Sequence, residues 1–259
     1  MKIGFFDSGI GGLSVLHQAL EILPREDYLF YADSDHVPYG EKSNGEIAEY
    51  VDGAVHFLLQ EGAGAVVVAC NTATSVAIEA LRRKYPVPIL GVEPAVKPAV
   101  ERSNSGRVLV VATPVTVREK KLHDLIERVD CKHIVDLLPL PELVRFAERF
   151  EFHSDAVVSY LRSAFAGHEL SAYSSLVLGC THFNYFKDTF RKIFPQKTVI
   201  LDSCAGTINH LARILRENGQ TESGACSVEY YRSGRKITDA ESLRQIRSLL
   251  YRLDQMALL

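Results

Sequence analysis

The chain has 259 residues, of which 47% are hydrophobic and 24% charged, and its formal net charge is −3 at pH 7. This composition is typical of a soluble globular protein with one large or two modest domains. The small negative charge gives no electrostatic basis for binding nucleic acid or an anionic membrane surface, and no apolar run reaches the roughly 18–20 residues of a membrane span.

Apolar strand-like runs alternate with helical periodicity along most of the chain. We predict strands at residues 2–6, 28–32, 65–70, 88–91, 107–113, 134–138, 176–180 and 198–201. We predict helices at residues 12–23, 45–60, 74–85, 115–129, 155–167 and 183–194, with further helices after Leu201. This alternation indicates an α/β fold with parallel sheets covered by helices, in which ligands bind beyond the carboxyl ends of the strands.

Two pairs of segments repeat the same pattern. KIGFFDSGIGG at 2–12 and RVLVVATPVTV at 107–117 each give an apolar strand followed by small and hydroxyl residues. CNTATSVAIEALRRKYP and CTHFNYFKDTFRKIFP each run from a cysteine through a helix with a basic end to a proline. We therefore expect two similar α/β domains, one made of residues 1–93 and 208–259 and the other of residues 94–207.

A cysteine stands at the end of a buried strand twice, in VVVACNTATS at Cys70 and in SLVLGCTHFN at Cys180. A helix N-terminus stabilises a thiolate, so we expect the pKa of each thiol to lie below about 8.5. The chain has five cysteines and no C-x-x-C pair. This odd set favours free thiols in a reducing cytoplasm, and no signal peptide is expected ahead of the strand at Lys2.

Two strand-end thiols are compatible with several chemistries. A redox dithiol usually shows C-x-x-C spacing, and a hydrolase would use one cysteine with an oriented histidine, leaving the other thiol without a role. A zinc site could be built from Cys70, Cys180, His182 and Asp7. A two-base proton transfer uses both thiols, on opposite faces of one carbon. We favour the last and expect no metal; a non-catalytic protein that binds a small carboxylate is the alternative from another class.

Polar residues surround both thiols in the sequence. Asp7 ends an apolar run, where an unpaired carboxylate would be costly, although Asp7 or Ser8 could equally serve as a helix N-cap. The glycines of FDSGIGGLS would let backbone N–H groups approach a negatively charged ligand. A lone histidine is usually structural, but because His182 stands two residues after Cys180 we favour a role in handling the proton of that thiol. A mostly neutral pocket for a zwitterion could be formed by Ser8, Asn71, Thr72, Thr113, Thr116 and Thr181.

The motifs FDSGIGGLSVL, PYG, ACNTA, GVEP, the pair Thr113 and Thr116, and GCTH follow one another along nearly the whole chain. In this order they resemble the glutamate racemases. The resemblance implies two pseudo-symmetric α/β domains with the active site in the cleft between them. It implies interconversion of L- and D-glutamate without a cofactor, which supplies D-glutamate for peptidoglycan synthesis. It also implies a cytoplasmic homodimer.

The same resemblance assigns roles to individual residues. Cys70 would act on the D-isomer with Asp7 as its assistant, and Cys180 would act on the L-isomer with His182. The segment LVRFAE resembles the one whose glutamate supports that histidine, which points to Glu148. Substrate would be bound at Ser8, Pro38, Tyr39, Gly40, Asn71, Thr72, Thr113, Thr116 and Thr181.

Two departures from the family pattern stand close to these motifs. GCTH is usually followed by Tyr-Pro-Leu, whereas this chain has Phe183-Asn184-Tyr185, and Glu119 stands where a serine is usual. The departures leave the proton-handling residues in place. They keep open the alternative that the substrate is aspartate or another acidic amino acid.

Overall fold

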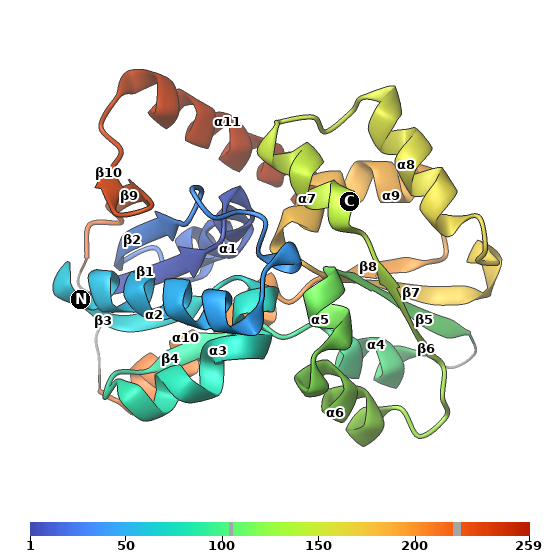
Figure 1. Cartoon of the computed structure of the whole chain (residues 1–259), viewed down its shortest axis with the longest axis horizontal. Helices are drawn as coiled ribbons and strands as arrows, with labels where there is room; N and C mark the ends of the chain where they lie inside the picture. Colours follow the sequence, from blue (N-terminus) through green and yellow to red (C-terminus); the bar gives the residue numbers. More distant parts are fainter. Residues whose placement is uncertain (104–105, 220–223) are drawn as a thin grey trace.

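Two separate sheets with flanking helices make up the computed structural model, which describes residues 1–103, 106–219 and 224–259 (Figure 1). The first sheet has the strand order β10-β9-β2-β1-β3-β4 and the second has the order β6-β5-β7-β8. Every pairing is parallel except that of β9 with β10. The predicted α/β fold with two parallel sheets is confirmed.

The strands are β1 (Lys2–Asp7), β2 (Asp27–Ala32), β3 (Ala63–Val68), β4 (Ile89–Gly91), β5 (Arg107–Ala112), β6 (Val135–Pro139), β7 (Tyr173–Gly179), β8 (Val199–Leu201), β9 (Val228–Arg232) and β10 (Arg235–Lys236). The α-helices are α1 (Leu13–Ile22), α2 (Asn44–Gln60), α3 (Asn71–Lys84), α4 (Val96–Arg102), α5 (Pro114–Arg118), α6 (Lys120–Val129), α7 (Pro141–Glu148), α8 (Asp155–Phe165), α9 (Lys187–Ile193), α10 (Cys204–Glu217) and α11 (Ala240–Ala257). Short 3-10 helices are η1 (Ile10–Gly12), η2 (Tyr39–Glu41), η3 (Leu170–Ala172) and η4 (Thr181–Phe186).

The two halves share one topology. The order β2-β1-β3-β4 in the first sheet matches β6-β5-β7-β8 in the second. Even the register irregularity recurs, between Lys2 and Ile3 where β1 meets β3 and between Arg107 and Val108 where β5 meets β7. Strands β1 and β3 of one half therefore correspond to β5 and β7 of the other.

Alternating residues of the central strands face different helical layers. Phe5 and Val67 belong to the core that contains residues of α1 and α10, whereas Phe6 and Val66 belong to the core that contains residues of α2 and α3. Burial on both faces explains why these strands read as continuous apolar runs. The first of these cores also includes side chains of β5, β7 and α11, so hydrophobic packing continues from one half into the other.

Several element boundaries differ from the sequence prediction. The expected helix 115–129 is divided at Glu119, whose backbone is extended (φ −69°, ψ 134°). The expected helix 183–194 begins only at Lys187, because the preceding residues form the 3-10 helix η4, which is buried all round and so lacks an amphipathic pattern. Helices α4 and α7 and the β9–β10 hairpin were not predicted.

The end of the chain packs back on the first half. Helix α10 packs on α1, β9 pairs with β2, and α11 contacts both α1 and η4 (Figure 1). Arg252 of α11 is buried, donates to the carbonyl of Tyr185 and forms an ion pair with Asp188. Helix α11 thus connects the first half to the segment that follows Cys180. Among the described helices none has the length and apolar character needed to cross a membrane.

Candidate active site

The predicted proton-handling residues stand at equivalent strand ends of the two halves. Asp7 is the last residue of β1, Cys70 follows β3, Thr113 follows β5 and Cys180 follows β7. The carboxyl ends of these strands are where ligands bind in open α/β sheets. Both thiols are 5% exposed and Asp7 is 0% exposed, so the site is screened from water.

Cys70 is the N-cap residue of α3, and its sulfur accepts the backbone N–H of Ala73 at 3.4 Å. The hydroxyl of Ser8 lies 3.6 Å from the same sulfur. Burial and then the negative charge of Asp7 outweigh these two groups and raise the pKa of Cys70 to about 12. The prediction of a lowered pKa is therefore wrong for Cys70. Cys180 also contributes to this raised pKa, so the two thiols lie within electrostatic reach of each other.

Cys180 belongs to a chain of three polar groups. Its sulfur lies 3.8 Å from Nδ1 of His182, and Nε2 of His182 lies 2.7 Å from Oε1 of Glu148. Burial disfavours the imidazolium, but the partners Cys180 and Glu148 outweigh burial and raise the pKa of His182 well above its usual value. A thiol, an imidazole and an orienting carboxylate in this sequence can move a proton to and from sulfur.

Asp7 connects the two halves rather than capping a helix. One of its oxygens accepts the N–H of Gly9 at 2.9 Å, and the other accepts the hydroxyl of Thr181 at 2.9 Å from the opposite half. The N-cap residue of α1 is Gly12, with no side-chain hydrogen bond. Burial raises the pKa of Asp7 above its ordinary value.

The glycine-rich turn lets the two halves approach closely. A Cβ atom on Gly11 would lie 2.5 Å from both Nδ1 of His182 and Oγ1 of Thr181. The N–H of Ile10 donates to Oε1 of Glu148 at 2.8 Å. We predicted that this turn offers backbone N–H groups to a ligand; the N–H of Ile10 instead bonds a carboxylate of the protein itself. Sequence reasoning missed the link because nothing near Ile10 in the sequence indicates it.

Three threonine hydroxyls from the two halves lie within hydrogen-bonding distance of one another. Oγ1 of Thr72, on α3, lies 2.8 Å from Oγ1 of Thr113 and 3.3 Å from Oγ1 of Thr116, both of the second half. All three side chains are buried. Thr113 also caps α5 by accepting the N–H of Thr116 at 3.2 Å, so the capping role and the place in the cluster coexist. We call these three residues the threonine cluster.

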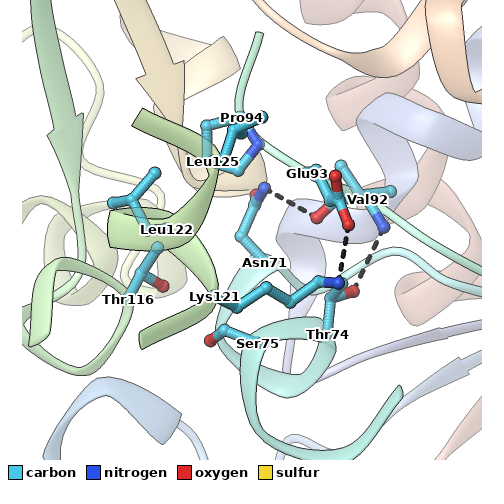
Figure 2. A pocket seen from close by; sticks show the side chains of 10 residues that line it. All are labelled: Asn71, Thr74, Ser75, Val92, Glu93, Pro94, Thr116, Lys121, Leu122 and Leu125. Carbon is cyan, nitrogen blue, oxygen red and sulfur yellow. Dashed lines mark hydrogen bonds and ion pairs between the residues drawn. The ribbon is translucent and has the colours of Figure 1, made fainter. Parts of the chain in front are cut away.

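Asn71 lies beside Val92, Glu93 and Pro94, where the chain passes from the first half to the second (Figure 2). Its amide donates to the carbonyl of Val92 at 3.1 Å and so does not point into the threonine cluster. Beside it, Lys121 of α6 forms an ion pair with Glu93 at 2.8 Å. A cavity of about 20 Å³ between these groups has room for about one water molecule.

The segment Pro38-Tyr39-Gly40 lies against Thr113 of the second half. Tyr39 is buried, and a Cβ atom on Gly40 would lie 3.0 Å from Cβ of Thr113. A cavity of about 190 Å³ next to this segment is lined by Val37, Pro38, Val144, Arg145, Glu148 and Arg149. Glu148, which lines this cavity, also bonds His182, so the cavity lies next to His182. Glu41 of η2 forms an ion pair at 2.7 Å with Arg145, another residue of the lining.

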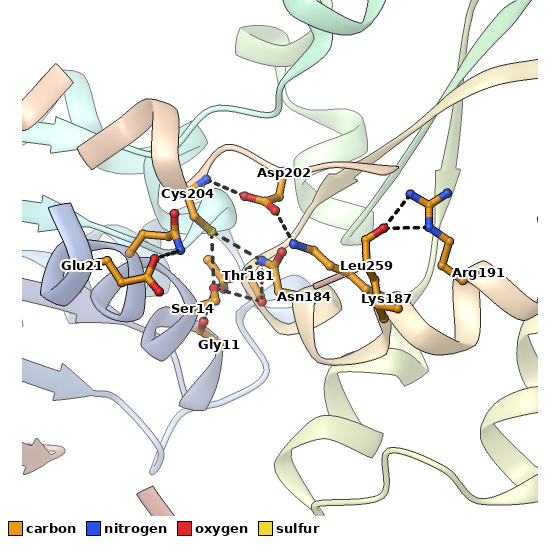
Figure 3. A network of polar contacts seen from close by, with 11 residues as sticks. Gly11, Ser14, Glu21, Thr181, Asn184, Lys187, Arg191, Asp202, Cys204 and Leu259 are labelled. Atoms are coloured by element: carbon orange, nitrogen blue, oxygen red, sulfur yellow. Dashed lines mark hydrogen bonds and ion pairs between the residues drawn. The ribbon is translucent and has the colours of Figure 1, made fainter. Parts of the chain in front are cut away.

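The residues that depart from the family pattern lie in the core or at the interface between the halves. Phe183 and Tyr185 are fully buried, and Glu119 accepts a hydrogen bond from Asn44 of the first half at 2.8 Å. The amide of Asn184 donates to the carbonyl of Thr181 at 3.1 Å and to Oγ of Ser14 at 3.3 Å (Figure 3). The Asn184 side chain thus bonds the backbone of Thr181 and the side chain of Ser14, and the departures have structural roles.

The zinc alternative is not assembled. Among the residues that the structure describes, the group of three potential ligands with atoms within 4.8 Å of one another is His17, Glu21 and Asp254, on α1 and α11. Cys70 and Cys180 are both free thiols.

Two similar α/β halves with one buried thiol from each are the features expected of an amino-acid racemase. Comparison with known proteins agrees with this class. Residues 10–211 match the family model described as Asp/Glu/Hydantoin racemase. The chain is 53% identical to the glutamate racemase of Lachnospira eligens over 99% of either chain. The structure of Escherichia coli glutamate racemase in complex with L-glutamate and the activator UDP-MurNAc-ala superimposes with a TM-score of 0.85, at 30% identity over 97% of this chain and 94% of that one. Glutamate racemase of Francisella tularensis in complex with D-glutamate gives 0.81, at 25% identity over 96% and 92%.

The chain therefore belongs to the Asp/Glu/Hydantoin racemase family and, within it, to the glutamate racemases. The resemblance inferred from its motifs is confirmed.

Proposed function

We infer that the chain interconverts L- and D-glutamate by two-base proton transfer, with Cys70 and Cys180 as the two bases. A full-length relative with 53% identity is a glutamate racemase, and two structural neighbours hold the two isomers of glutamate. The observation that carries the proposal is the pair of buried thiols at equivalent strand ends, with Nδ1 of His182 3.8 Å from Cys180 and Asp7 within electrostatic reach of Cys70.

The proposed reaction starts with L-glutamate when Cys180 is the thiolate. Cys180 takes the proton from Cα, the electron pair of the broken C–H bond stays on Cα, and the thiol of Cys70 delivers a proton to the opposite face to give D-glutamate. The reverse reaction uses the thiolate of Cys70, and because the pKa of this thiol is raised to about 12, the thiolate must form by passing its proton to Asp7. His182, oriented by Glu148, handles the proton of Cys180, and Asp7 handles that of Cys70.

The protein's own groups must stabilise the carbanion, and we propose that they do so without a cofactor. Hydroxyls of the threonine cluster and of Ser8 can donate to the substrate carboxylates, and hydrogen bonds are stronger in a site screened from water. Each tenfold in rate requires about 1.4 kcal/mol of such stabilisation. Substrate entry requires Thr72 to exchange its partners Thr113 and Thr116 for the ligand, so the halves must separate and close again.

The remaining inferences rest on the same proposal. D-glutamate formed here would supply peptidoglycan synthesis in the cytoplasm, and the chain would act as a homodimer. Residues 1–93 with 208–259 form one proposed domain and residues 94–207 the other. Supporting this division, the C-terminal strands β9 and β10 belong to the first sheet.

The test follows D-glutamate by optical rotation and by NMR in deuterium oxide, without added cofactor. The wild type should lose rotation and place deuterium at Cα of the product. Cys70→Ser and Cys180→Ser should each lower racemisation by roughly 10²–10⁴-fold, the contribution of one acid–base residue. In each variant the remaining thiol should still exchange the α-proton of one isomer, D for Cys70 and L for Cys180.

Cys131→Ser is the matched control, because Cys131 is exposed and should leave the rate unchanged. A wild-type rate in either active-site variant, or a product without deuterium, would contradict the two-base mechanism. Thermal stabilisation by glutamate without any change of rotation would support a binding protein instead. A parallel assay with aspartate decides the substrate.

A further inference from the structure

Asp33 is a buried carboxylate that the proposed chemistry does not use. It follows β2, its backbone N–H donates to the carbonyl of Asp7 at 2.9 Å, and its side chain is only 3% exposed. Three side chains donate to it: the hydroxyl of Tyr39 at 2.6 Å, Nδ1 of His36 at 2.9 Å and the hydroxyl of Ser233 at 3.1 Å. A buried carboxylate is costly unless it is bonded in this way, so its place needs a reason.

The shortest of these bonds determines where Tyr39 lies. The Tyr39 ring is 1% exposed and packs 6.2 Å from the ring of Phe6 and 6.1 Å from that of Tyr50, measured between centroids. Packing fixes the ring laterally, and the bond to Asp33 fixes the position of its hydroxyl end. A hydrogen bond to an ionised acceptor is stronger than one between neutral groups.

The position of Tyr39 in turn determines that of Gly40. The backbone of Gly40 lies so close to Thr113 that an added Cβ atom would be 3.0 Å from Cβ of that residue. The segment is short, and a shift of the Tyr39 ring would move Gly40 relative to the threonine cluster. Asp33 itself is fixed on its other side by Ser233, whose N–H donates to the carbonyl of Ala32 at 2.8 Å.

We propose that Asp33 is a positioning residue that acts through the Tyr39 hydroxyl to place the backbone of Tyr39 and Gly40 against the substrate. This inference rests on the proposed glutamate racemisation. It predicts a specific energetic coupling between Asp33 and Tyr39, because either one without the other loses the same bond. The effect belongs mainly to KM, since in the proposed reaction this segment binds glutamate in the ground state and in the transition state alike.

The experiment measures kcat and KM for D-glutamate in Asp33→Ala, which removes the acceptor, in Tyr39→Phe and in the double variant. Each single change should raise KM by ~10–100-fold, the range for one hydrogen bond to a charged group, with kcat changed less than about threefold. The double variant should be no worse than the more affected single variant. The matched control pair is Asp136→Ala and Tyr173→Phe, because the Tyr173 hydroxyl donates to Asp136 at 3.0 Å far from the thiols, at the start of β7. These controls should lower Tm and leave KM unchanged.

Additive losses in the double variant, or an equal rise of KM in the control pair, would overturn the role of Asp33. If Asp33→Ala does not fold, Tyr39→Phe alone still tests the proposal, because an unchanged KM would contradict it. An inactive wild type contradicts the proposed function instead, so the two failures are distinguishable.

Discussion

Gly11→Ala should damage the site through a single added carbon atom. Gly11 is not among the glycines with positive φ, so alanine meets no backbone strain there, and the effect is one of contact alone. The new Cβ would lie 2.5 Å from Nδ1 of His182 and Oγ1 of Thr181 and 2.7 Å from the backbone nitrogen of His182. Ordinary contacts of about 3.4 Å require η1 and η4 to move apart by almost 1 Å, which breaks the hydrogen bond from Thr181 to Asp7.

Overpacking of this kind costs about 1–3 kcal/mol of stability, and a 1 Å misplacement at reacting groups can cost about 10²-fold in rate. We therefore expect Gly11→Ala to lower kcat/KM by about two orders of magnitude, measured by circular dichroism of D-glutamate. Gly53→Ala is the control, since its Cβ would meet nothing within 4 Å and alanine is the better residue in α2 by up to about 1 kcal/mol. A Gly11→Ala enzyme within threefold of the wild-type rate would refute the argument that this contact aligns the site.

Two further predictions concern stability. Because the pKa of the Cys70 thiol is raised from 9.0 to about 12, the folded state holds the thiol proton more tightly than the unfolded state does. The stability that this proton contributes is complete below pH 9 and is lost as pH rises toward 12. The difference in unfolding free energy between wild type and Cys70→Ala, measured by urea titration, should thus fall by up to ~1.4 kcal/mol per pH unit above pH 9. If the unfolding free energies of the two proteins change in parallel with pH, the raised pKa is contradicted. Arg252→Met should cost about 3 kcal/mol, because the carbonyl of Tyr185 and the carboxylate of Asp188 lose a buried partner. The exposed Arg244→Met on the same helix should change stability by less than about 0.5 kcal/mol, and an equal loss in both variants would refute the role of the buried guanidinium.

Local patterns were sufficient to predict strands β1 to β8 and the residues at their ends. The apolar runs before Asp7, Cys70, Thr113 and Cys180 are long enough to identify buried parallel strands, and the repeat between halves identifies their equivalence. The β9–β10 hairpin was missed because β10 has two residues, both exposed, and so carries no hydrophobic alternation. The sequence identifies Glu148 through the segment LVRFAE, which resembles a family motif, but it does not predict the helix α7 that carries this residue.

Contacts between the halves could not be predicted, because they join residues far apart in the sequence. Glu148 accepts from Ile10, Thr181 donates to Asp7, and neither pair has a local signal. The glycines between Asp7 and Leu13 did indicate a close approach, but they could not reveal that the approaching group would be His182. A glycine in sequence shows that space is needed and not what fills it.

The pKa of Cys70 shows most directly how a local rule is overruled. Cys70 does begin α3, and the Ala73 N–H does favour its thiolate, as the sequence suggests. A helix terminus contributes about 0.3–1 kcal/mol to a nearby charge, whereas full burial of an ionisable group can shift its pKa by up to about 3–5 units, or several kcal/mol. Burial of Cys70 and its proximity to Asp7 depend on β1 and on the opposite half packing over the site. The larger contribution is tertiary, so the direction of this shift follows from the fold and not from the residues next to the cysteine.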